Sequence, residues 1–191
     1  MGIITTSAHY PTIITTTATG EWNDEVWIIP NAVSADDDSY AGVSAATFDA
    51  NLGSYLLKLG GFKFEVPTGA TVNGIIFQIE KYGTASDAED GTVQLTKNFT
   101  AGVGNDLRIV AGLWPTTLTA TTYGGTSNLW GTTWSPSEVN NDNFGLLFSV
   151  SSVGTNTDAF VDYIRTTVTY TISDIYVPRH GFIHHNNPAI A

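Results

Sequence analysis

The sequence of 191 residues contains no cysteine, and this absence excludes several kinds of chemistry at once. Disulfide bonds, thiolate zinc sites and cysteine nucleophiles are all ruled out. Basic residues are also scarce, with 7 Lys and Arg against 18 Asp and Glu, so the formal net charge is −11. Because phosphate backbones and anionic lipid surfaces repel such a chain, we expect neither nucleic acid nor a membrane as a partner.

Long apolar runs are missing as well, so no segment is predicted to cross a membrane as a helix. The first residues, MGIITT, lack the basic and apolar regions of a secretion signal, and we expect synthesis in a cytoplasm without export. Motifs of a serine nucleophile elbow, a phosphate loop or a zinc protease do not occur. We therefore expect no enzyme, no catalytic residue and no cofactor.

The sequence has instead a period-two alternation of apolar and polar residues, which is typical of half-buried β-strands. The alternation runs through residues 62–66, 73–81, 92–96, 144–150 and 160–172. In the last of these, Phe160, Asp162 and Ile164 are predicted to share the inner face. Turn sequences such as Gly60-Gly61 and Asp90-Gly91 separate the strands.

This pattern predicts an all-β protein, an antiparallel β-sandwich of jelly-roll-like topology, with an immunoglobulin-like sandwich as the alternative. The sandwich is expected to span residues 22–172. One short helical turn is predicted after Ser135, because Ser135, Pro136 and Glu138 form a capping box with proline at the first helical position.

The two ends differ from the middle and are predicted to be extended arms, at residues 1–21 and 173–191. Their apolar side chains are candidates for contact with a neighbouring subunit: Ile3, Ile4, Tyr10, Ile13 and Ile14 in the first arm, and Tyr176, Val177, Phe182, Ile183 and Ile190 in the second. Packing of each arm on the chain's own body is the alternative.

Four segments carry a resemblance to a known family: GFKFEVPTGATVNGI at 61–75, NLWGTTW at 128–134, NFG at 143–145 and VDYIRTTV at 161–168. In this order and spacing they resemble a family of bacteriophage virion structural proteins, over roughly residues 25–171. The resemblance implies a component of a tailed-phage particle and leaves its place in the capsid, tail or fibre open.

The resemblance favours a non-enzymatic capsid decoration or cement protein, found in the virion after synthesis in a host bacterium. Its partners would be the major capsid protein or tail proteins, and its own copies would form a homo-oligomer, with a trimer favoured. Arms that add a strand to a neighbour's sheet would join many weak contacts into one lattice. The alternatives are a tail-associated carbohydrate- or receptor-binding module and, on fold analogy alone, an enzyme acting on polysaccharide.

An aromatic cluster in a Gly- and Thr-rich stretch supplies the candidate residues for the carbohydrate-binding alternative: Trp114, Tyr123, Trp130 and Trp134. Flat rings stack on sugar faces, and indole nitrogens donate hydrogen bonds. The competing interpretation, which we favour, is that these rings anchor long loops onto the sandwich, since Trp and Tyr are highly buried on average.

Acidic loops at Asp36 to Asp38 and Asp87 to Asp90 could supply oxygen ligands to calcium, but they lack the spacing of a calcium-binding EF-hand. We interpret them as solvated turns and predict no metal site. The same holds for the histidines near the C-terminus, His180, His184 and His185, because Gly181 and Pro188 disfavour a rigid helix around them.

Asp162 is the one carboxylate predicted on an inner strand face, where it needs a partner. We expect structural pairing, with Arg108 as a candidate. A catalytic role would need a second carboxylate, as in glycosidases, and Glu80 or Asp158 would have to supply it.

Overall fold

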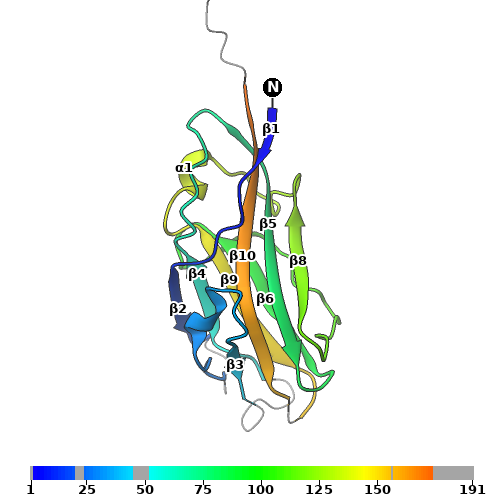
Figure 1. Ribbon diagram of the computed structural model, residues 1–191. Helices are drawn as coiled ribbons and strands as arrows, with labels where there is room; N and C mark the ends of the chain where they lie inside the picture. Colours follow the sequence, from blue (N-terminus) through cyan, green and yellow to red (C-terminus); the bar gives the residue numbers. More distant parts are fainter. Residues whose placement is uncertain (1, 20–23, 45–51, 156, 174–191) are drawn as a thin grey trace, which may run out of the picture.

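The computed structural model describes residues 2–19, 24–44, 52–155 and 157–173, which form two antiparallel β-sheets packed face to face (Figure 1). The elements in chain order are β1 (Gly2–Thr5), β2 (Ile13–Thr17), the 3-10 helix η1 (Pro30–Val33), β3 (Ala41–Val43), β4 (Leu56–Gly60), β5 (Thr71–Gly83), β6 (Ala88–Thr96), β7 (Gly102–Asp106), β8 (Thr119–Gly125), α1 (Pro136–Val139), β9 (Gly145–Ser152) and β10 (Ala159–Ile172).

Sheet A has the strand order β1-β10-β5-β8, with β3 also paired to β10, and sheet B has the order β2-β4-β9-β6-β7. Between consecutive strands the chain passes from one sheet to the other at every connection except that from β6 to β7. This alternation is typical of a jelly-roll-like arrangement. The predicted antiparallel β-sandwich is confirmed.

The core between the sheets is rich in aromatic rings. Phe77 of β5 is fully buried, and its ring lies 5.4 Å from that of Phe62 and 6.0 Å from that of Trp130, both edge-on. The indole nitrogen of Trp130 donates a hydrogen bond to the carbonyl oxygen of Ile75 at 3.0 Å. The largest buried side chain of this region therefore leaves no polar atom unsatisfied.

A β-bulge in β10 changes which residues face the core. The register with β5 shifts between Val161 and Ile164, and both of these side chains are fully buried. Phe160 is only half-buried, and its ring stacks on that of Tyr82 at 5.0 Å. The prediction that Phe160 shares the inner face with Ile164 is therefore wrong, because the bulge inserts an extra residue that the regular alternation does not reveal.

A second bulge lies in β6, where the register with β9 shifts between Asp90 and Thr92. The prediction that Asp90-Gly91 forms a turn between strands is therefore wrong, because both residues lie at an irregularity inside one strand, β6. The extra residue turns both Asp90 and Val93 toward the core, where both are buried. The bulges in β6 and β10 thus decide which way the side chains of Asp90 and Asp162 face.

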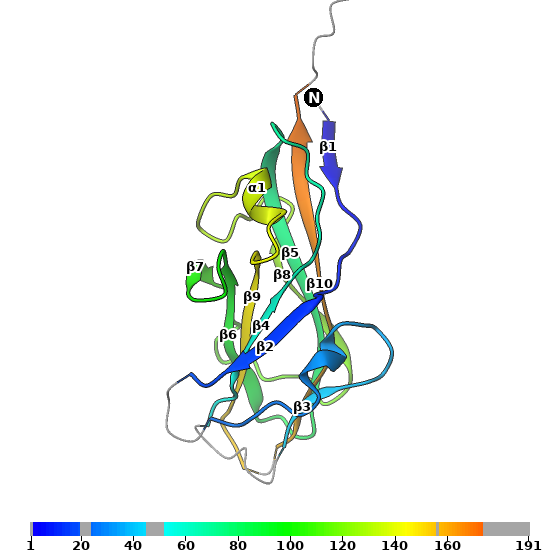
Figure 2. The same cartoon turned by 90° about the vertical axis from the view of Figure 1, so that its left-hand side faces the viewer.

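The N-terminal segment pairs with the chain's own sheets. β1 is antiparallel to β10, with Gly2 opposite Ile172, and β2 is antiparallel to β4. Figure 2 shows the segment between them running down the side of the sandwich from sheet A to sheet B. The predicted boundary at residue 22 therefore does not separate an arm from the sandwich. The predicted C-terminal arm, with Tyr176, Val177, Phe182, Ile183 and Ile190, lies outside the described residues.

Two local predictions have different outcomes. The helical turn after Ser135 is confirmed, since α1 begins at Pro136 and Ser135 and Glu138 form the capping box. Residues 62–66 do alternate between buried and exposed side chains, but they pair with no strand. None of the helices within the described ranges has the length and apolar character that crossing a bilayer requires.

Candidate functional site

A polar groove of about 510 Å³ crosses the outer side of sheet B. Its floor is formed by β9 and β6, including Ser149, Ser151 and Thr92, and one wall by residues 52–54 together with Asp24. Arg108 lies on the groove as well. A volume of this size lies in the range of ordinary small-molecule sites, which is about 300–1,000 Å³.

Hydrogen-bonding capacity is available in the groove. One carboxylate oxygen of Asp24, Oδ2, accepts hydrogen bonds from the backbone nitrogen and hydroxyl of Thr19, both at 2.6 Å. The other, Oδ1, is buried and accepts no hydrogen bond. Glu89 accepts a long hydrogen bond of 3.4 Å from the Ser151 hydroxyl. The carboxylate of Glu89 and the hydroxyls of Thr92, Ser149 and Ser151 are the hydrogen-bonding groups that the groove offers to a ligand.

The groove floor is fastened to its wall by a buried serine. The hydroxyl of Ser54 accepts a hydrogen bond from the backbone nitrogen of Val150 at 3.0 Å, and the backbone nitrogen of Ser54 donates to the Val150 carbonyl at 2.8 Å. Glu25 then pairs with the other side of this segment, since its backbone nitrogen donates to the Gly53 carbonyl. These contacts place Asp24 beside β9.

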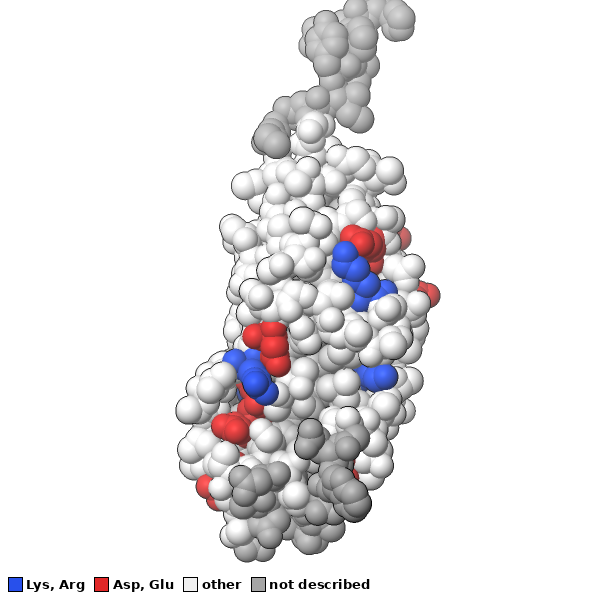
Figure 3. Space-filling model, turned by 180° about the vertical axis from the view of Figure 1, so that it is seen from behind, with Lys and Arg blue, Asp and Glu red and all other residues white. Residues whose placement is uncertain are grey.

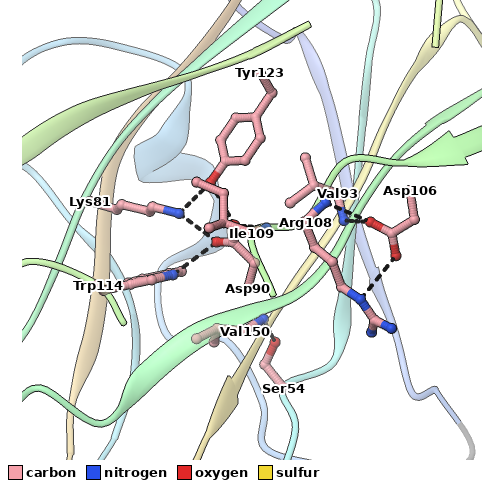
Figure 4. A network of polar contacts seen from close by, with 10 residues as sticks. All are labelled: Ser54, Lys81, Asp90, Val93, Asp106, Arg108, Ile109, Trp114, Tyr123 and Val150. Carbon is pink, nitrogen blue, oxygen red and sulfur yellow. Dashed lines mark hydrogen bonds and ion pairs between the residues drawn. The ribbon is translucent and has the colours of Figure 1, made fainter. Parts of the chain in front are cut away.

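Arg108 is held on the groove by contacts with Asp90, which is buried, and with Asp106, which is exposed (Figure 4). Asp90 Oδ2 accepts a hydrogen bond from the backbone nitrogen of Ile109 at 3.0 Å, and Asp106 Oδ1 accepts one from the backbone nitrogen of Arg108 at 3.0 Å. The guanidinium itself donates to the Gly91 carbonyl at 2.9 Å. The backbone at Ile109 is thus fixed from inside the sandwich by Asp90, while about half of the Arg108 side chain is exposed to a ligand.

The carboxylate that fixes this loop belongs to an ion pair inside the core. Lys81 of β5 points inward from sheet A and donates to Asp90 Oδ1 at 2.5 Å, with both side chains almost fully buried. Trp114 donates to the same oxygen at 2.9 Å, and the Tyr123 hydroxyl, which accepts from Lys81, donates to Asp90 Oδ2 at 2.8 Å. The ammonium also lies 4.6 Å from the centre of the Trp114 ring.

Burial dominates the electrostatics of this ion pair. It lowers the pKa of Lys81, and the attraction of Asp90 offsets the effect only in part. Burial, followed by the charge of Asp90, raises the pKa of Tyr123 well above its usual value. Tyr123 is therefore a neutral hydroxyl that can donate, and the carboxylate of Asp90 receives a hydrogen bond from every polar group around it.

The sparse basic residues do not form a patch on the face seen in Figure 3, where most blue atoms lie beside red ones and uncharged surface predominates. Among the ion pairs of the protein, Lys63 pairs with Asp142 at 2.5 Å, and Lys97 with Glu138 at 2.6 Å.

The aromatic residues named from the sequence do not form a platform. Trp114, Tyr123, Trp130 and Trp134 are each exposed by 6% or less. Their polar atoms bond inward, as Trp134 does to the Leu129 carbonyl at 3.1 Å. A ring buried in this way presents no face to a sugar.

Of the residues expected to contact a neighbour, Ile3 and Ile4 remain exposed, by 76% and 40%. Tyr10 lies against the chain's own Tyr163, with ring centres 6.2 Å apart, and Ile13 and Ile14 are half-buried in β2. The histidines at 180, 184 and 185 lie outside the described residues.

The expected pairing of Asp162 with Arg108 is wrong. Arg108 lies at the groove on sheet B, whereas Asp162 lies in the β10 bulge with carboxylate oxygens of Glu80 and Asp36 within 4.8 Å. Sequence reasoning considered Glu80 as a partner but had no spacing that selected it. Asp24 and Ser151 were not identified, and Glu89 was assigned to an acidic loop although it lies in β6, because only the pairing of distant strands brings these residues together.

No protein-family model matches the chain, and no curated protein matches it either. Among solved structures, the second N-terminal cellulose-binding domain of β-1,4-glucanase C from Cellulomonas fimi is similar, with a TM-score of 0.43 and 11% identity, over 86% of this chain and 93% of that domain. A family 29 carbohydrate-binding module from Piromyces equi gives a TM-score of 0.38 and 10% identity, over 87% and 91%. Likeness at this level assigns no ligand to this chain.

Proposed function

We propose that the protein is a non-catalytic binding module and that the groove on sheet B takes an uncharged polysaccharide. The observation that carries this proposal is the groove itself, which is lined by the hydroxyls of Thr92, Ser149 and Ser151, with Asp24 and Glu89 as acceptors and Arg108 as a donor. A sugar presents many hydroxyl groups that both donate and accept, so such a set can satisfy several of them at once.

Charge supports the choice of an uncharged ligand. The net charge of −11 repels anionic chains, and the groove holds the carboxylates of Asp24 and Glu89 against the single cation of Arg108. Its lining, within the described part of the chain, includes no His, Lys or Tyr that could act as a base for Ser149 or Ser151.

Binding is tested by isothermal titration calorimetry and by a pull-down on insoluble polysaccharides, with a glycan array to choose the sugar. We expect Asp24→Asn, Glu89→Gln and Arg108→Ala each to weaken binding by about 10-fold or more, because a hydrogen bond to a charged group contributes about 1.5–3 kcal/mol. The matched control is Lys63→Ala, which removes an exposed side chain outside the groove and should bind as the wild type does. A ligand that binds equally well to all three groove variants would exclude this site.

A second candidate function is assembly into a phage particle through contacts with other virion proteins. It is favoured by an apolar groove of about 400 Å³ that contains Ile28, Ile29, Tyr40 and Phe160. Ile28 and Ile29 are exposed by 54% and 66%, and Ile29 has a positive φ of 50°, which is strained for a β-branched residue. Exposed apolar side chains at the rim of a groove are typical of protein interfaces.

Assembly is tested by sedimentation of the purified chain alone and with capsid or tail proteins, and by gel analysis of purified virions. Ile28→Ser together with Ile29→Ser should abolish the association while leaving glycan binding intact. A chain that is absent from the particle, or a double variant that associates normally, would exclude this candidate.

A further inference from the structure

Three carboxylates converge on the outer side of sheet A, opposite the groove. Glu80 comes from β5, Asp162 from the bulge of β10, and Asp36 from the loop that follows η1. One oxygen from each lies within 4.8 Å of the others. The bulge is what brings Asp162 to this place, since it turns the residue away from the regular alternation of the strand.

The convergence alone is not a site, but Asp162 adds a second observation. Asp162 is exposed by only 1%, and its Oδ1 atom is buried without a hydrogen-bond partner. A buried carboxylate oxygen without a donor is costly, and buried charges in proteins are normally paired or bound to a metal. The nearby guanidinium of Arg165 lies 3.8 Å from Asp36, on the exposed side of the cluster.

We propose that Asp36, Glu80 and Asp162 bind one calcium ion. The geometry fits, because two oxygens that contact the same Ca²⁺ at about 2.3–2.6 Å are separated by at most about 5 Å. The three oxygens within 4.8 Å can therefore reach a single ion without rearrangement of the strands. Water molecules and carbonyl groups of the loop would complete the coordination.

Ligand type and rigidity decide between metals. The cluster offers only carboxylate oxygens, which suit Ca²⁺ and Mg²⁺ and disfavour zinc or copper. Magnesium requires a compact octahedron at about 2.0–2.1 Å and is usually held by one or two carboxylates. Three carboxylates spread over 4.8 Å, one of them on a loop, fit the larger and more tolerant ion better.

The electrostatics of the three carboxylates agree with this geometry. Burial, followed by the hydrogen bond with Asp162, raises the pKa of Glu80, and burial also raises the pKa of Asp162. Backbone amides of Asp37 and Asp38 act in the opposite direction on Asp162. A divalent cation between the carboxylates would remove their repulsion and satisfy the orphaned oxygen.

The ion would join segments that the strand ladders leave separate. Asp36 belongs to the loop between η1 and β3, and that loop is tied to β10 by the backbone pairing of Ser34 with Tyr163. A calcium ion would add a link from the same loop to both β5 and β10. Its binding free energy would therefore stabilise the fold, in addition to any role of the groove on sheet B.

The test uses the full chain after treatment with EDTA and dialysis, titrated with CaCl₂ in a calorimeter and melted with and without the ion. We expect one binding site per chain, and a rise of Tm by about 5–10 °C at a free Ca²⁺ of roughly 100 times Kd. MgCl₂ at the same concentration should give a smaller shift. No saturable binding at millimolar Ca²⁺, or an equal effect of Mg²⁺, would overturn the proposal.

Variants locate the ion. Glu80→Gln and Asp36→Asn should each weaken calcium affinity by at least about 10-fold. Asp36 is exposed, so its variant should fold even if Asp162→Asn does not. Asp142→Asn, which neutralises an exposed carboxylate in the pair with Lys63, is the matched control and should bind calcium unchanged. A calcium shift that survives in Asp36→Asn and Glu80→Gln combined would place the ion elsewhere and refute the assignment.

Discussion

The buried pair of Lys81 and Asp90 allows a sharp test of how the two sheets are joined. Replacing Lys81 by Met removes the ammonium and keeps an unbranched apolar side chain in its place. Asp90 would still accept hydrogen bonds from Trp114, Tyr123 and Ile109. These bonds stabilise its buried charge, so the loss of the ammonium should cost less free energy of unfolding than it would for an isolated carboxylate. Breaking a buried pair costs about 3–5 kcal/mol, and we expect the lower end of this range.

Asp90→Asn should cost more, at the upper end of the same range of about 3–5 kcal/mol, because it leaves the buried Lys81 ammonium without a negative charge beside it and turns one acceptor oxygen of Asp90 into an NH₂ group among donors. The lowered pKa of Lys81 gives this variant a way to recover, since the amine can lose its proton. Stability of Asp90→Asn should therefore rise with pH toward the ordinary lysine pKa of 10.5, a dependence that Lys81→Met cannot show.

The double variant completes the cycle. The sum of the two single costs should exceed the cost of the double variant by about 2–3 kcal/mol, as expected for groups in direct contact. Urea unfolding followed by tryptophan fluorescence measures all four proteins, with the midpoint and the slope fitted separately. Additive costs, or a Lys81→Met variant as stable as the wild type, would refute the view that this pair is charged and joins the sheets.

Three further outcomes follow from other contacts. Glu138→Gln should lower stability by less than about 1 kcal/mol at pH 7, because the pair with Lys97 is partly exposed. The hydrogen bond from Lys97 holds the pKa of Glu138 below 4.5, so this stabilisation is present above pH 4.5 and disappears as the pH falls through the lowered value; a pH-independent difference would contradict the assignment. Gly145→Ala should cost more than about 3 kcal/mol in urea unfolding or prevent folding, because its Cβ would lie 1.8 Å from the Leu59 carbonyl oxygen of the paired strand; a neutral result would mean that β4 and β9 are not in this register. Trp130→Phe should cost about 2–4 kcal/mol by the same measurement, since it leaves a cavity and an unpaired carbonyl, whereas a surface position would show almost no change.

The fold class could be predicted from the sequence because period-two alternation is a local property. The capping box at Ser135 was found for the same reason, since all its residues lie within four positions. The bulges in β6 and β10 could not be predicted, because an inserted residue is defined by the partner strand and the sequence does not show which strand that is. Asp90 was consequently assigned to a turn and Asp162 to the core.

The groove could not be predicted for a related reason. Asp24, Ser54 and Ser151 are ordinary polar residues with no motif around them, and they meet only because residues 52–54 pair with β9. Trp114 and Tyr123 were named together with Trp130 and Trp134, but their contacts with the Lys81 pair depend on an inward-facing lysine, which the apolar pattern of β5 conceals. Chemistry of this kind is carried by contacts between residues far apart in the chain.

The pairing of β1 with β10 has a consequence for how the protein is made. Gly2 lies opposite Ile172, so the first strand to be synthesised finds its partner only when the last one has emerged from the ribosome. Until then the backbone groups of β1 have no partner strand, and its isoleucines are exposed. Closing the long loop between β1 and β10 is slow. Folding of sheet A is therefore expected to finish only after β10 has been synthesised, and the nascent chain passes through a stage in which it depends on protection from aggregation.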